Sequence, residues 1–114
     1  MNTTFLKMFF FDFNKYNLSF RVKKEIENIY NNLLKNNNYI IEIYGHTDNI
    51  GNDNFNTNLS QNRANVVMKY LLDLGKVKNR IKVFGYGKSK LFLPNTSKNN
   101  RNMNRRVEFK IIKK

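Results

Sequence analysis

Residues 39–75, YIIEIYGHTDNIGNDNFNTNLSQNRANVVMKYLLDLG, hold a strand pattern, a polar loop and a helix pattern in direct succession. The β-branched and aromatic run Tyr39–Tyr44 predicts a strand. Residues 45–58 begin with a glycine and are mostly polar or small, which predicts a loop. From about Leu59 the apolar residues recur at helical spacing, so an amphipathic helix is expected, ending at Gly75. Its buried stripe would consist of Ala64, Val67, Leu71 and Leu74.

Upstream of this stretch the chain predicts another strand and another helix. Residues Phe5–Phe13 are rich in Phe and are typical of a strand, and the polar residues 14–17 form the turn that follows it. Ser19 is placed to cap the helix, which should end at the polar residues 36–38. The apolar side chains that share one face of this helix are Val22, Ile26, Ile29 and Leu33.

Downstream, Ile81–Phe84 and the alternating run Val107–Ile111 predict two more strands. Residues 94–104 lie between them and carry the only proline, so they are expected to form a long loop with one helical turn. The predicted fold is α+β: a two-layer sandwich in the order β-α-β-α-β-β, with the helices packed on one face of a mixed sheet. At 114 residues, the whole chain 1–114 should form a single domain.

The net charge of +13 is the strongest compositional signal and favours an acidic polymer such as nucleic acid as a partner. Yet basic residues occur in almost every segment, and the abundance of Lys and Asn also suits an AT-rich genome. The absence of cysteine excludes disulfides, thiol metal sites and thiol nucleophiles. With His46 as the only histidine, we expect no metal site, cofactor or His-dependent triad. No apolar run approaches the roughly 20 residues of a membrane helix, so membrane contact would come only through a segment absent from this chain.

Three stretches in the same order carry a family resemblance. They are FDFNKYNL at 11–18; IYGHTD at 43–48, which continues through Gly51 and Asn56 to Leu59, Ser60, Arg63 and Ala64; and GYG at 85–87 with NRRVE at 104–108. Together they resemble the OmpA-like peptidoglycan-binding domain, which outer-membrane protein A, the peptidoglycan-associated lipoprotein and the flagellar stator protein MotB share. The middle stretch is the most specific.

The resemblance implies that Asp48 and Arg63 hold the diaminopimelate of the peptidoglycan stem peptide. Diaminopimelate ends in an ammonium and a carboxylate on one carbon, which suits a carboxylate acceptor and a bidentate guanidinium donor. Asp48 would take the ammonium and Arg63 the carboxylate, so the two side chains should converge and be accessible to solvent. Supporting residues would be Asp12, Thr47, Asn56 and Arg105. The resemblance also implies that one of Arg105 and Arg106 packs beside the groove and pairs with a carboxylate, whereas without it the two could be a nucleic-acid patch or a solvated strand end.

The resemblance further implies a non-enzymatic periplasmic domain that anchors the outer membrane or an envelope complex to the cell wall; a homodimer is left open. Taken without it, Asp48 and Arg63 could form an ordinary structural salt bridge. Thr47 and Asn56 could satisfy the backbone of their own loop, and Asp12 could be a turn residue. A basic nucleic-acid-binding module is the alternative function. An enzyme that uses Asp12 and Asp48 as an acid and base pair on a glycan has the least support.

Overall fold

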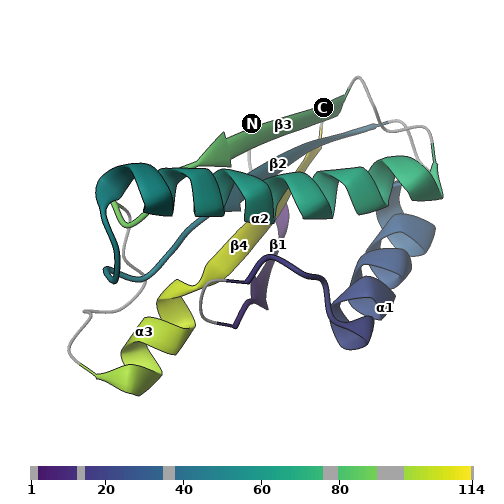
Figure 1. The fold of residues 1–114 in the computed structure, drawn as a ribbon. Coiled ribbons are helices and arrows are strands. Elements are labelled where there is room, and N and C mark those ends of the chain that lie inside the picture. The colour runs from purple at the N-terminus through teal and green to yellow at the C-terminus, as the bar shows by residue number, and fades with distance from the viewer. Residues whose placement is uncertain (1–2, 13–14, 35–37, 76–79, 90–96, 114) are drawn as a thin grey trace.

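The computed structural model describes residues 3–12, 15–34, 38–75, 80–89 and 97–113, with only the backbone of residues 3–5 and of Leu33. Figure 1 shows the elements in chain order. They are β1 (Thr3–Phe10), α1 (Phe20–Ile29) with the π-helical turn η1 (Tyr30–Leu34), β2 (Tyr39–Gly45), α2 (Asp53–Leu74), β3 (Ile81–Gly85), α3 (Lys98–Asn104) and β4 (Arg106–Lys113).

The four strands form one mixed sheet in the order β1-β4-β2-β3. β4 is antiparallel to both β1 and β2, and β2 is parallel to β3. Helices α1 and α2 cover one face of this sheet, while the short α3 lies beyond the end of the strands (Figure 1). The predicted two-layer α+β fold is therefore confirmed, with α3 as an addition to the predicted order.

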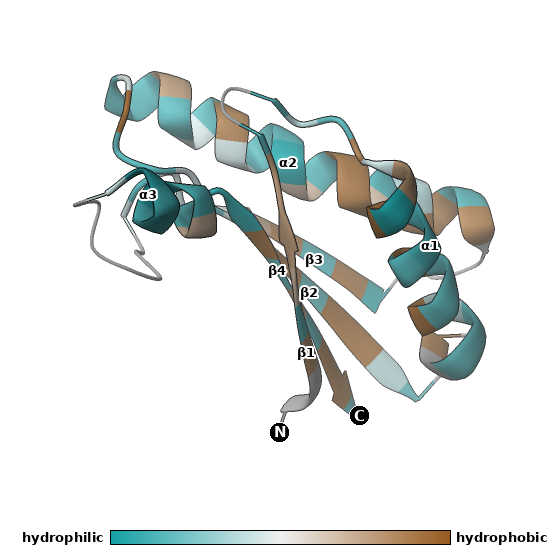
Figure 2. Cartoon of the chain, turned by 90° about the horizontal axis from the view of Figure 1, so that it is seen from below, coloured by the Kyte–Doolittle hydropathy of each residue, from teal (hydrophilic) through white to brown (hydrophobic). Residues whose placement is uncertain are grey.

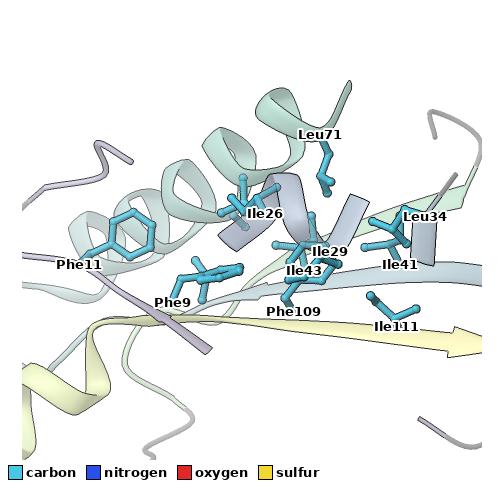
Figure 3. Packing of buried hydrophobic residues seen from close by; sticks show 13 residues of the cluster. Phe9, Phe11, Ile26, Ile29, Leu34, Ile41, Ile43, Leu71, Phe109 and Ile111 are labelled. Carbon is cyan, nitrogen blue, oxygen red and sulfur yellow. The ribbon is translucent and has the colours of Figure 1, made fainter. Parts of the chain in front are cut away.

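The core lies between the sheet and the two long helices (Figure 3). Alternate residues of the central strands point inward, and Ile43 and Phe109 are fully buried there. Ile26 of α1 and Leu71 of α2 meet them from the helical layer and are also fully buried. Each such side chain contributes roughly 1.5–3 kcal/mol relative to an exposed one, so this interface is the main source of stability.

The first helix begins as predicted and ends differently. Ser19 caps it, because its Oγ accepts a hydrogen bond of 3.2 Å from the backbone N–H of Val22. At its end the π-helical turn η1 fits one more residue into the turn than an α-helix does, which advances the buried face by one position. Leu34 is consequently fully buried. The side chain of Leu33, which the helical spacing predicted in the core, lies outside the described residues.

The second helix starts at Asp53, so the predicted loop up to Asn58 is wrong. Asn52 caps the helix by accepting a hydrogen bond of 2.8 Å from the N–H of Phe55, and the carboxylate of Asp53 lies in the first turn, where the helix dipole favours it. The predicted stripe is confirmed: its first three members are fully buried and Leu74 packs against the core. The helix ends at Gly75 as predicted.

The connection between β3 and β4 also differs from the prediction. Within residues 97–104, Ser97 caps α3 through a hydrogen bond of 3.1 Å from the N–H of Asn100, so this part is a helix and not a loop with one helical turn. The preceding residues 90–96, including Pro94, lie outside the described residues, as do residues 13–14. The first strand was predicted to end at Phe13, but β1 ends at Phe10. Among the helices of the described chain, none has both the length and the apolarity to cross a membrane.

Candidate functional site

Three chain segments meet at one end of the sheet, where β1 and β2 end and β4 begins. The N–H of Phe11 donates to the carbonyl of Arg105 at 2.8 Å, and the N–H of His46 donates to the carbonyl of Arg106 at 2.9 Å. The loop after β2 is also tied to the turn after β3, since the N–H of Thr47 donates to the carbonyl of Gly87 at 2.8 Å. These bonds place four of the predicted site residues, Asp12, Thr47, Asp48 and Arg105, around one point, while Asn56 and Arg63 belong to α2.

Arg63 is fully buried, and its guanidinium binds backbone carbonyls. Nε donates to Lys15 at 2.8 Å, Nη1 to His46 at 3.1 Å and Nη2 to Asp12 at 2.9 Å. Burial, followed by the positive charge of Arg105, lowers the pKa of Arg63 to about 10, while the negative charge of Asp48 opposes this change. Arg63 thus remains a cation at neutral pH, held between the loop after β1 and the loop after β2.

Asp48 is 2% exposed and has partners on both carboxylate oxygens. Oδ1 accepts a hydrogen bond of 3.0 Å from the N–H of Ile50, within its own loop. Oδ2 accepts one of 3.2 Å from Nη1 of Arg105. Arg105 also donates from Nε to the carbonyl of Phe11 at 3.0 Å and contacts the Asn102 side chain. One of Arg105 and Arg106 was expected to pair with a carboxylate, and both do: Arg105 with Asp48, and Arg106 with Glu108.

The two principal residues converge, but their exposure differs from the expectation. Arg63 binds the carbonyl of His46, two positions before Asp48, and the Asp48 charge acts on it. Both side chains are nearly or wholly buried, however, and not open to solvent. The physical cause is that three carbonyls surround the guanidinium, while Arg105, whose side chain is 13% exposed, lies on Asp48.

The other predicted residues form hydrogen bonds with backbone groups close to them in the chain. The carbonyl of Asp12 accepts from Lys15 N–H at 3.1 Å as well as from Arg63. Thr47 donates from Oγ1 to the carbonyl of Asp48 at 2.9 Å, and Asn56 donates from Nδ2 to the carbonyl of Gly51 at 3.4 Å. These bonds match the local alternative for each residue, and they hold the loops around Asp48.

Sequence reasoning did not identify Lys15 and His46 as partners of Arg63. Both act through their carbonyls, which every residue carries, so no side-chain pattern could have revealed them. It also missed Ser60, whose Oγ accepts a hydrogen bond of 2.8 Å from the N–H of Gly87 and so joins α2 to the turn after β3. Across the described part of the chain, no group of three or more His, Cys, Asp or Glu side chains could hold a metal ion.

Comparison with known proteins identifies this arrangement. The OmpA family model matches residues 10–105. Outer membrane porin F of Pseudomonas aeruginosa is 32% identical over 102 residues, which cover 89% of this chain and 29% of the porin. The crystal structure of the peptidoglycan-associated lipoprotein from Burkholderia pseudomallei has a TM-score of 0.87 at 25% identity and covers 92% of this chain and 89% of that one. The C-terminal domain of Helicobacter pylori MotB has a TM-score of 0.85 at 28% identity, covering 95% and 85% of the two chains.

The chain spans between 21% and 29% of the length of the first curated relatives, all of them outer-membrane proteins. The porin, lipoprotein and MotB relatives belong to the outer membrane and the periplasm and are structural proteins, not enzymes. The family match includes the loops and the helix that bring Asp12, Asp48, Arg63 and Arg105 together. The chain therefore belongs to the OmpA family, as an envelope-associated periplasmic domain that is not an enzyme.

Proposed function

We propose that this domain binds peptidoglycan non-covalently through the diaminopimelate of the stem peptide, and so anchors the outer membrane or an envelope complex to the cell wall. Family membership supports binding to the wall. The observation that carries the proposal is the convergence of one carboxylate, Asp48, and one guanidinium, Arg63, at the same end of the sheet. Their opposite charges complement the ammonium and the carboxylate at the end of diaminopimelate.

Asp48 is the proposed partner of the ligand ammonium. A carboxylate offers about four lone-pair sites, of which Ile50 N–H and Arg105 each use one. An ammonium can therefore add to the free positions or replace Arg105 on Oδ2. Because Arg105 is the more exposed partner of this ion pair, the ligand would approach Asp48 from the side of Arg105.

Arg63 is the proposed partner of the ligand carboxylate. The bonds to Lys15, His46 and Asp12 use one N–H on each guanidinium nitrogen, so one N–H is left on each terminal nitrogen, the number that a carboxylate accepts from a guanidinium. Because Arg63 is fully buried, binding would require the loops around it to separate. Asp12, Thr47, Asn56 and Arg105 would contribute by holding these loops and, after such an opening, by contacting the ligand.

The test is co-sedimentation with purified sacculi that contain diaminopimelate. Asp48→Asn keeps the size of the side chain and removes its charge, and we expect it to weaken binding at least about tenfold, because a charge-assisted bond is lost. The matched control is Asp53→Asn, which removes a carboxylate whose side chain is 82% exposed at the start of α2 and should bind as the unmodified protein does. Circular dichroism would show that both variants fold.

Two results would contradict the proposal. One is equal binding of Asp48→Asn and the unmodified protein. The other comes from sacculi with lysine in place of diaminopimelate. These sacculi lack the terminal carboxylate, so the protein should bind them more weakly. Equal binding to both kinds of sacculi would remove diaminopimelate as the recognised group while leaving wall binding in place.

A further inference from the structure

The face of the sheet opposite the helices carries a second group of side chains suited to binding. The alternation that buries Ile41 and Ile43 turns Glu42 and Tyr44 to this other face. In the register of the sheet, Tyr44 pairs with Phe84 of β3 and with Glu108 of β4. Among the described elements, no helix covers this face, since α1 and α2 lie on the other side (Figure 2).

Tyr44, Phe84 and Tyr86 form an aromatic cluster on this face. The ring centroids of Tyr44 and Phe84 are 5.0 Å apart, those of Tyr44 and Tyr86 are 5.6 Å apart, and all three rings are within 14° of parallel. Lys110 Nζ lies 4.8 Å from the Tyr44 centroid, so the cluster is fixed from the β4 side. Phe84, on the edge strand, is 37% exposed and thus offers its ring to a ligand.

The polar groups around the aromatic cluster suit a neutral, hydroxyl-rich ligand. Glu42 accepts a hydrogen bond of 2.7 Å from the Tyr44 hydroxyl, and Glu108 pairs with Arg106 at 2.8 Å. Lys82 lies beside Glu42 across the strands. Despite the +13 charge of the whole chain, both carboxylates of this face lie next to a cation, so the face offers hydrogen-bond acceptors and donors side by side, which suits sugar hydroxyl and amide groups.

The aromatic cluster continues to the diaminopimelate site described above. The Tyr86 ring lies 5.7 Å from the His46 ring. The next residue, Gly87, accepts the hydrogen bond from Thr47, directly before Asp48. One polymer could therefore contact both the aromatic cluster and the site at Asp48. Such a polymer would need rings with apolar faces and, next to them, an acidic peptide.

We propose that the aromatic cluster binds the glycan strand of peptidoglycan, with the C–H face of a sugar ring on Phe84, while the stem peptide of the same strand reaches Asp48. The negative face of an aromatic ring attracts the C–H groups of a pyranose, which supplies the contact. This inference rests on the proposed function. It adds the sugar as a second recognised part of the ligand.

The test compares the disaccharide-tripeptide muropeptide with the free tripeptide L-alanyl-γ-D-glutamyl-diaminopimelate by calorimetry. The unmodified protein should bind the muropeptide roughly tenfold more tightly than the tripeptide, the gain expected of one well-packed ring contact. Phe84→Ala should abolish this difference and leave tripeptide affinity unchanged. Phe84→Leu, which keeps an apolar side chain and so preserves the fold, should lose most of it. The matched control is Phe20→Ala, at a ring that is 75% exposed on α1, and it should retain the full difference.

The outcomes separate this inference from the proposed function. An unchanged muropeptide preference in folded Phe84→Leu would overturn the glycan site and leave the diaminopimelate site intact. If the tripeptide does not bind at all, the proposed function fails, and tetra-N-acetylglucosamine then decides the glycan site: Phe84-dependent binding supports it and no binding overturns it. Displacement of the muropeptide by single-stranded oligouridylate at physiological salt would assign the aromatic cluster to nucleic acid instead.

Discussion

At Arg63 a ligand-binding role and a structural role involve the same guanidinium. The motif around it predicts a ligand contact, whereas its bonds in the structure tie the carbonyls of Asp12, Lys15 and His46 together. Two loops that are far apart in the sequence are thus joined through one buried side chain. A substitution of Arg63 would lower stability as well as binding, so loss of binding in an Arg63 variant is no evidence for ligand contact unless the fold is measured too.

Arg63→Met should lower the free energy of unfolding by about 3–5 kcal/mol, because it leaves buried carbonyls without a donor. Methionine has a similar reach and adds no charge, so the loss reports the missing hydrogen bonds. Urea denaturation measures the change. Arg21→Met is the control, since the Arg21 side chain is 90% exposed, and it should change stability by less than about 0.5 kcal/mol. A similar small effect of Arg63→Met would mean that the carbonyls of Asp12, Lys15 and His46 find other donors.

The sequence predicted which residues gather at the site but not their mutual contacts. The convergence of Asp48 and Arg63 followed from the motif, because the motif fixes a loop after a strand and the next helix. Their burial did not follow, since the partners of Arg63 are carbonyls and the position of Arg105 depends on where α3 ends. Whether either side chain contacts a ligand stays a prediction, which the sacculus experiment tests.

For the helices, the spacing of apolar residues predicted which side chains are buried better than it predicted the residue at which a helix begins. The stripe of α2 was correct because apolar residues at helical spacing must face the sheet. Its start was predicted about six residues late, because residues 53–58 contain only one large apolar side chain, Phe55, and that one is 44% exposed. The shift of the buried face by one residue at η1 could not be predicted from the residue types either. It accompanies the packing of Leu34 in the core.

β2 and α2 approach each other closely at Gly45. A Cβ at this position would lie 1.9 Å from the Ser60 carbonyl oxygen and 2.7 Å from its carbon, both backbone atoms of the helix. Gly45→Ala must therefore push α2 away from the sheet, and we expect it to lower the free energy of unfolding by about 3 kcal/mol or more. Since α2 carries Arg63, binding to sacculi should weaken as well.

Gly51→Ala is the comparison that isolates this effect. Gly51 has a φ of 98°, so alanine is strained there, but the nearest atom to its Cβ would be Cδ1 of the Phe55 side chain at 3.1 Å, which can move. The expected cost is about 1 kcal/mol. Equal costs of the two substitutions in thermal or urea unfolding would show that α2 can move away from Gly45 at little cost, so that its approach to β2 does not require glycine there.

For the whole molecule, the charge of +13 adds a non-specific attraction to any wall polymer that bears carboxylates. Charges on the protein surface are screened within about 10 Å at 0.1 M salt and about 3 Å at 1 M, whereas a contact at a buried carboxylate is screened much less. Two components of binding should therefore separate with salt: a sequence-independent one from the scattered lysines and a specific one from Asp48.

Co-sedimentation with sacculi across a salt series would separate them. At about 0.01 M salt, where the screening length is about 30 Å, both the unmodified protein and Asp48→Asn should bind, because the net charge suffices. Near 0.5 M the variant should be released while the unmodified protein stays bound. If both are released along the same curve, attraction by net charge accounts for the binding, and the buried side chains of Asp48 and Arg63 would then serve the fold alone.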